Sequence, residues 1–135
     1  DRNEAQLSEA VERLQQLKLD VQAAAADVCD RTAIAHILDT QPSVDVAVAV
    51  AGVYRSRAFD ELSDADFQRT LDVNLRHQFF ALQAVAPGMA AAGGGSIVNF
   101  SSVSYHTMTP QLSVYQAAKA AVIAAAWPAS DPVSP

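Results

Sequence analysis

The sequence predicts an α/β fold with a parallel β-sheet and helices packed on it. Segments with apolar residues at helical spacing alternate with short β-branched runs along the 135 residues. One such run, "VDVAVAVAG" (residues 44–52), is nearly uncharged and ends in glycine. That composition is typical of a strand buried on both faces of a parallel sheet. Alternating strands and helices favour right-handed crossovers between parallel neighbours.

Capping residues mark the first two helices. Residues 3–18 have apolar side chains at helical spacing behind Asn3, a preferred N-cap. Asp30 can cap a second helix, which should stop at Pro42. The small apolar run at residues 21–26 lies between these helices and predicts a short strand.

A long helix and a last helix are expected on either side of a third strand, "SIVNFSS" (residues 96–102). A capping box formed by Ser63 and Asp66 begins the long helix, which covers about residues 63–92 with a kink at Pro87. The last helix is expected over residues 113–127.

The last eight residues, 128–135, hold three of the six prolines and predict an irregular tail. A single domain is therefore expected over residues 1–127. The first helix has no strand before it, and the chain does not begin with methionine. We therefore expect the chain to be an excerpt of a longer protein whose sheet is incomplete here at both ends.

Composition excludes several classes of partner. The net charge is −6 without a Lys/Arg cluster, which argues against nucleic acid or an anionic membrane. The apolar runs are too short to span a bilayer, and no signal peptide is visible. One cysteine, Cys29, excludes an internal disulfide, and the scattered histidines do not form a zinc ligand set. A cytoplasmic location without a metal is therefore expected.

The segment "YQAAK" places Tyr115 four residues before Lys119. On a helix this spacing puts the phenol and the ammonium on the same face. A neighbouring cation stabilises a phenolate, so this pair could exchange a proton with an alcohol or a carbonyl. The alternative is a packed aromatic residue beside a solvated charge.

Together with other segments, "YQAAK" resembles the Tyr-x-x-x-Lys motif of the short-chain dehydrogenase/reductase family. "GGGSIVNFSS" is similar to the segment that carries the family's serine, and Ser102 lies thirteen positions before Tyr115. "LDVNLR" resembles the asparagine-bearing part of the family's long helix, at Asn74, and "AAAADVCD" resembles its adenine-holding turn. The resemblance covers Asp1 to about Trp127 and implies a Rossmann-like three-layer sandwich.

The resemblance implies an oxidoreductase that moves hydride between a nicotinamide and a ketone or secondary alcohol. Tyr115 would be the general acid/base, and Lys119 would assist it and hold the nicotinamide ribose. Ser102 would donate a hydrogen bond to the substrate oxygen, and Asn74 would bind a relay water. Two alternatives stay open: Ser102 could only cap a strand end, and Asn74 could face solvent.

The resemblance also implies a nucleotide site. Asp1 would pair with the adenosine ribose hydroxyls, which favours NAD, although the adjacent Arg2 could accept the 2′-phosphate of NADP. Asp27 and Val28 would flank the adenine, and Ala51 and Gly52 would run along its ribose. Tyr115 and Lys119 would contact the nicotinamide end.

Three departures from the family bear on activity. The five glycines, at positions 52, 88, 93, 94 and 95, include no phosphate-binding loop near the start. The family's Asn-Asn-Ala-Gly is Ala-Val-Ala-Gly at residues 49–52, and the family's final strands do not follow Pro128. We therefore expect this chain alone to be inactive, although it carries the four catalytic residue types.

Association through helices is a further expectation from the resemblance. The helices over 63–92 and 113–127 would form a homo-oligomer interface from several apolar side chains (Phe79, Phe80, Leu82, Ala118, Val122 and Trp127). The alternative is that these side chains pack inside the domain. An inactive relative that acts as a partner subunit is accordingly the second hypothesis beside the enzyme.

Overall fold

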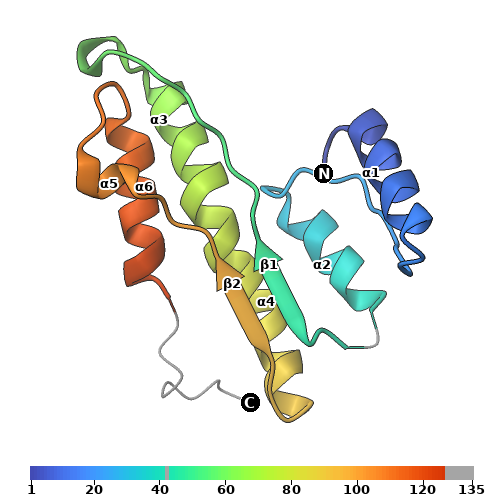
Figure 1. Cartoon of the computed structure of the whole chain (residues 1–135). Coiled ribbons are helices and arrows are strands. Elements are labelled where there is room, and N and C mark those ends of the chain that lie inside the picture. The colour runs from blue at the N-terminus through green and yellow to red at the C-terminus, as the bar shows by residue number, and fades with distance from the viewer. Residues whose placement is uncertain (42, 127–135) are drawn as a thin grey trace.

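A computed structural model describes residues 1–41 and 43–126, which form a small parallel sheet with helices around it (Figure 1). The sheet pairs β1 (Val46–Ala49) with β2 (Ser96–Asn99). Val46 lies opposite Ser96 and Ala49 lies opposite Asn99. Because the strands are parallel, their carboxyl ends meet at one edge, where the chain continues into two neighbouring loops.

One long helical stretch joins the two strands. It consists of α3 (Asp64–Leu71), a π-helical turn η2 (Asp72–Arg76) and α4 (His77–Ala91). The Ser63 hydroxyl accepts a hydrogen bond from the Asp66 amide and donates one to its carboxylate, so the predicted start is confirmed. Pro87 lies inside α4, and Gly93, with φ of +93°, follows the helix end.

Helices α1 (Glu4–Gln16) and α2 (Arg31–Asp39) also begin as predicted, because the side chains of Asn3 and Asp30 accept amide hydrogen bonds from their first turns. The loop after β1 contains a 3-10 turn, η1 (Phe59–Glu61), that the sequence did not signal. In Figure 1, α1 and α2 lie on the opposite side of the strands from α5 and α6.

After β2 come a short helix α5 (Ser104–Thr107), which we predicted as loop, and α6 (Ser113–Ala124). The final helix is thus confirmed over most of its predicted length. Trp127 and the predicted tail, residues 128–135, lie outside the described residues.

The prediction of a strand at residues 21–26 is wrong, because this segment joins no ladder in the described chain. Its backbone bonds are to Asp1: the Ala26 amide donates to the Asp1 carbonyl at 3.0 Å, and the Asp1 amino group donates to the Ala24 carbonyl at 3.4 Å. One residue cannot make a strand pair, so extended backbone here does not become sheet.

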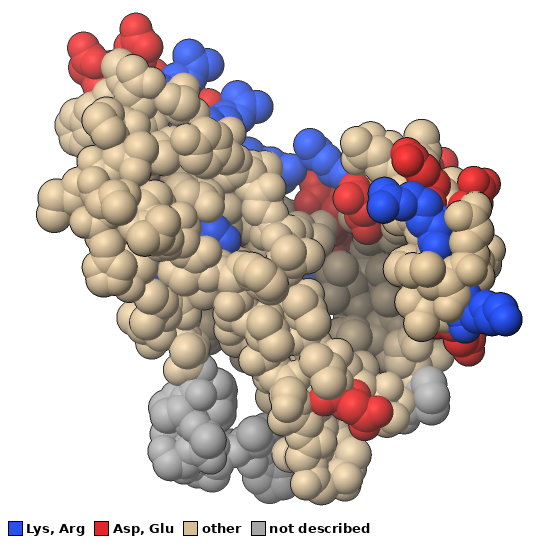
Figure 2. All heavy atoms as spheres, viewed as in Figure 1, with Lys and Arg blue, Asp and Glu red and all other residues tan. Residues whose placement is uncertain are grey.

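The strand over residues 44–52 is shorter and more exposed than predicted. Only Val46–Ala49 pairs, and Val46 and Val48 are 58% and 55% exposed. Alternate side chains point to opposite faces of a strand, and α4 packs against β1. The expectation of burial on both faces is therefore wrong for the described residues. Figure 2 shows little charge over β1, β2 and α6, whereas charges gather around α1.

The apolar core follows the long helix, whose first half (α3 and η2) packs on α6 and whose second half (α4) packs on β1 and α2. Its buried side chains come mainly from α4, α6 and the turns beside them (Val73, Leu82, Val85, Met89, Leu112, Val114, Ala118 and Val122). Three residues expected at an oligomer interface, Leu82, Ala118 and Val122, belong to this core and are wrongly assigned to the outer surface. In the described chain no helix has the length and apolar character needed to cross a membrane.

Candidate active site

Four segments meet at the carboxyl ends of β1 and β2. The loop after β1 begins at Val50 and includes Gly52, and the loop after β2 begins at Phe100. The η2 turn brings Asn74 beside the first loop, and α6 brings Lys119 beside the second, as the contacts below establish. Chemistry-bearing side chains from distant parts of the sequence therefore gather at one edge of the sheet.

Lys119 is buried at this edge, with 4% of its surface exposed. Its Nζ atom donates to the Phe100 carbonyl oxygen at 2.8 Å. Burial lowers the pKa of the Lys119 ammonium from its ordinary value. The Nζ atom lies 5.8 Å from the centre of the Tyr115 ring, which places the cation beside the phenol as the four-residue spacing predicts. Lys119 is thus not a solvated surface charge.

Tyr115 is half-buried and makes an edge-to-face contact with Tyr54, with ring centres 5.5 Å apart. Tyr54 follows Gly52 by two residues and is itself exposed. Tyr54 is not among the residues predicted for the site, because nothing in the spacing of the β1 loop signals a contact with the distant helix α6.

The two serines after β2 make different contacts. The Ser102 hydroxyl donates to the Ser104 hydroxyl at 2.9 Å and accepts from the Ser104 amide at 3.2 Å. The Ser101 hydroxyl donates to the Lys119 carbonyl at 2.7 Å, which ties the strand end to α6. Among the described residues no hydrogen bond joins Ser102 directly to Tyr115. Ser104 is a second site-adjacent residue that sequence analysis missed.

Asn74 is fully buried, so the alternative of a solvent-facing residue is wrong. Its Nδ2 atom donates to the carbonyls of Val53 and Thr70, both at 2.9 Å. Its Oδ1 atom accepts from the Val53 amide at 3.2 Å. The π-helical turn leaves backbone carbonyls without regular helical partners, a feature frequent at functional sites. Here the turn lets one side chain hold the β1 loop.

Gly52 lies close to the Asn74 and Lys119 side chains. A Cβ atom at residue 52 would lie 3.1 Å from the Asn74 Oδ1 atom and 4.0 Å from the Lys119 Nζ atom. Gly52→Ala should therefore lower the free energy of unfolding by about 1–3 kcal/mol, measured by urea denaturation. Gly88→Ala is the matched control: it meets no atom within 4 Å and lies within α4, so it should stabilise by about 0.5–1 kcal/mol. Equal effects at both positions would contradict the close approach.

The five residues predicted for the adenosine part of a nucleotide line one cavity of about 210 Å³: Asp1, Asp27, Val28, Ala51 and Gly52. Two arginines that line it pair with Asp27: Arg69 at 3.5 Å and Arg2 at 3.8 Å. The Cys29 amide donates to the Asp27 carboxylate, and this bond, with the two arginines, lowers the pKa of Asp27. Arg69 was not predicted as part of this cavity, because it lies on α3, far in sequence from the other residues of the nucleotide site.

His77 predicts a pH dependence of stability. Burial, helped by the nearby Lys119 cation, lowers the pKa of His77 below 6.5. As pH falls below 6.5, the unfolded chain gains the proton first, so the unfolding free energy should drop, by at most about 1.4 kcal/mol per pH unit. His77→Leu should remove this slope, measured by denaturation between pH 7.5 and 5. His36→Leu, at an exposed position of α2, is the control and should keep it.

Comparison with known proteins identifies the family. A family model described as short chain dehydrogenase matches residues 1–131. The chain belongs to the short-chain dehydrogenase family. The D-xylose 1-dehydrogenase of Caulobacter vibrioides is 38% identical over 96 residues, which are 71% of this chain and 39% of that protein. The chain thus spans less than half the length of this curated relative.

Solved structures of two oxidoreductases match the fold. A Brucella melitensis 3-oxoacyl-(acyl-carrier protein) reductase with bound NAD has a TM-score of 0.83 and 35% identity, over 92% of this chain and 50% of that one. A gluconate 5-dehydrogenase from Burkholderia cenocepacia, in complex with NADP and tartrate, has a TM-score of 0.79 and 32% identity. The match covers 90% of this chain and 49% of that one. The predicted Rossmann-like fold is confirmed, and this chain holds part of it.

Proposed function

We propose that this chain is the central part of an NAD(P)-dependent oxidoreductase that interconverts a secondary alcohol and a ketone. The observation that carries the proposal is the gathering of Asn74, Tyr115 and Lys119 around the carboxyl ends of the two strands. Membership of the short-chain dehydrogenase family supports it. The proposed domain covers residues 1–127, and a cytoplasmic location is part of the proposal.

Tyr115 would exchange the proton of the substrate oxygen. The buried ammonium of Lys119 places a positive charge 5.8 Å from the centre of the Tyr115 ring, where charge would develop during proton transfer. The Ser102 hydroxyl would donate to the substrate oxygen. It now donates to the Ser104 hydroxyl, and a hydroxyl hydrogen can rotate about its C–O bond to a new acceptor. Asn74 would keep the β1 loop in place, and a water bound near it would connect Lys119 to solvent.

The nucleoside end of a dinucleotide fits the residues present. Gly52 lines the cavity, and Asp1 and Asp27 supply acceptors at its rim. A bound nicotinamide dinucleotide would supply or accept the hydride. NAD is favoured, since Arg2 is engaged with Asp27 rather than free for a 2′-phosphate, and NADP remains the second option. Pyrophosphate contacts would require a glycine loop that the described residues do not contain.

The substrate would be a small polyhydroxylated alcohol or its ketone. The names of two relatives, a D-xylose 1-dehydrogenase and a gluconate 5-dehydrogenase, support this class. Tyr54 adds support, because an exposed aromatic ring in contact with Tyr115 offers a face on which a sugar ring or polyol chain can pack.

Nucleotide titration tests the proposal. NADH and NADPH fluorescence would be followed with the 135-residue chain and with the same chain extended at its N-terminus by a strand, a glycine-rich loop and a helix. We expect weak binding by the chain alone and micromolar binding of NADH by the extended chain. If circular dichroism shows that the extended chain is folded and it still binds no nucleotide, the proposal is refuted.

A second candidate is a non-catalytic partner subunit that associates through its helices. A groove between the long helix and α6 favours it; its volume is about 570 Å³ and it is lined largely by apolar side chains (including Leu71, Leu75, Phe79, Ala121 and Ala124). Phe79 is 46% exposed there. Sedimentation of the wild type and of Phe79→Gln tests association through this groove: a dimer that Phe79→Gln dissociates supports it, and a wild-type monomer excludes self-association.

A further inference from the structure

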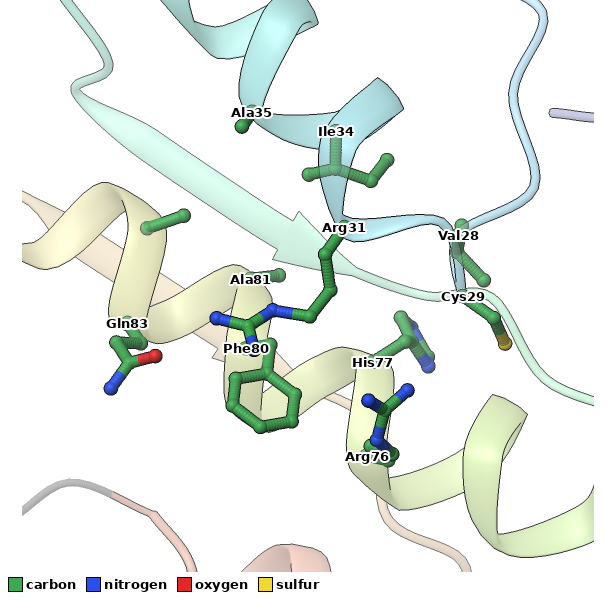
Figure 3. Close-up of a pocket in the computed structure, with 11 residues that line it drawn as sticks. Val28, Cys29, Arg31, Ile34, Ala35, Arg76, His77, Phe80, Ala81 and Gln83 are labelled. Atoms are coloured by element: carbon green, nitrogen blue, oxygen red, sulfur yellow. The ribbon is translucent and has the colours of Figure 1, made fainter. Parts of the chain in front are cut away.

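A second cavity, with largely apolar walls and a few polar groups, lies between α2 and α4 (Figure 3). Its volume is about 160 Å³, and we call it the α2–α4 cavity. Apolar walls come from Val28, Ile34, Phe80 and Ala81, and the polar groups in it are chiefly Arg31, Arg76 and His77. Among the described residues, Val28 alone lines both this cavity and the cavity proposed for the nucleotide.

Two guanidinium groups converge on one aromatic ring in this cavity. The Arg31 Cζ atom lies 3.9 Å from the centre of the Phe80 ring, and the Arg76 Cζ atom lies 5.2 Å from it. A guanidinium over an aromatic ring gains cation–π attraction and keeps N–H donors free for an anion. Two like charges this near one ring repel each other, and an anion between them would relieve that repulsion.

Neither arginine has a carboxylate partner within 4 Å among residues 1–41 and 43–126. The acidic residues nearby in sequence are already engaged. Asp30 accepts from the first amides of α2, Asp72 accepts from the Gln68 side chain, and Asp27 pairs with other arginines. The positive charge of the cavity is therefore not neutralised by the described protein.

His77 adds an independent observation. This side chain lines the cavity, is 7% exposed, and has no hydrogen-bond partner for either ring nitrogen. The Val73 carbonyl one turn earlier lies near the ring but outside hydrogen-bond geometry. Buried polar atoms without a partner cost free energy, and such atoms in a native protein often mark a place where a ligand group or water binds.

We propose that the α2–α4 cavity binds a small organic carboxylate, held by Arg31 and Arg76 with His77 as a third polar contact. A planar carboxylate matches the forked donors of a guanidinium. The ring of Phe80 and the aliphatic walls would cover a short hydrocarbon or aromatic body. Inorganic phosphate fits less well, because the apolar walls would remove its hydration without replacing those hydrogen bonds. This proposal does not depend on the proposed oxidoreductase activity.

Proton NMR of the histidine rings tests the proposal with benzoate as the probe. The chain has three histidines, so the His77 signal can be identified by its loss in His77→Leu. We expect benzoate to shift the His77 signal saturably and to leave the exposed His36 signal unchanged. Arg31→Gln should raise the dissociation constant at least about tenfold, since a charged hydrogen bond is lost.

Arg13→Gln is the matched control, because it removes one exposed positive charge from α1 and touches neither wall of the cavity. It should leave benzoate affinity within about twofold, the scale of an exposed charge. The proposal fails if Arg13→Gln weakens binding as much as Arg31→Gln, if His36 shifts with His77, if benzoate produces no saturable shift, or if inorganic phosphate binds as tightly as benzoate.

Discussion

Asn74→Leu should lower the free energy of unfolding by about 3 kcal/mol. The substitution keeps the branched shape of the side chain but removes three hydrogen bonds, and it leaves the Val53 amide and carbonyl and the Thr70 carbonyl without these partners. Since residue 74 is fully buried, water cannot replace them. Urea denaturation followed by circular dichroism measures the loss.

Asn3→Ala provides the comparison for Asn74→Leu. Asn3 accepts one amide hydrogen bond as the cap of α1, and it is exposed. Its removal should cost about 1 kcal/mol, within the range for an N-cap. If Asn74→Leu unfolds at the same urea concentration as Asn3→Ala, then Asn74 does not hold the β1 loop against the π-helical turn. The proposed part of Asn74 in catalysis would then be the only role left for this side chain.

Tyr115→Phe should lower kcat about 10³-fold in a chain completed by the flanking segments of a relative. Loss of the phenol hydroxyl removes the proposed proton donor, and general acid–base groups contribute on this scale. The ring, its contact with Tyr54 and the nearby Lys119 ammonium are retained, so the fold and the affinity for NADH should not change. Steady-state oxidation of a sugar or polyol, with NADH affinity measured separately, checks this split.

Tyr54→Phe is the control, because it retains the ring in contact with Tyr115 and removes only an exposed hydroxyl. It should change kcat by less than about threefold, as expected for a group outside the proton transfer. Tyr115→Phe with near-normal kcat would refute the acid/base role, and an equal loss of kcat in Tyr54→Phe would show that the loss is not specific to the proposed proton donor.

Local signals in the sequence determined where the helices begin. Asn3, Asp30 and Ser63 cap α1, α2 and α3 as predicted, because a capping side chain binds amides only two or three residues away. The four-residue spacing of Tyr115 and Lys119 likewise determined that they share a face of α6. These features need no distant part of the chain.

Contacts between distant segments were decided only by the tertiary structure. The burial of Asn74 depends on a π-helical turn meeting the β1 loop, and the contact between Tyr54 and Tyr115 depends on how α6 packs. Residues 21–26 have the composition of a strand but pair with no strand among the described residues, and Val46 and Val48 lie on the exposed face of β1. The physical reason is that strand pairing and burial depend on the neighbouring segments. The residues of a segment do not by themselves specify which neighbours will pack against it.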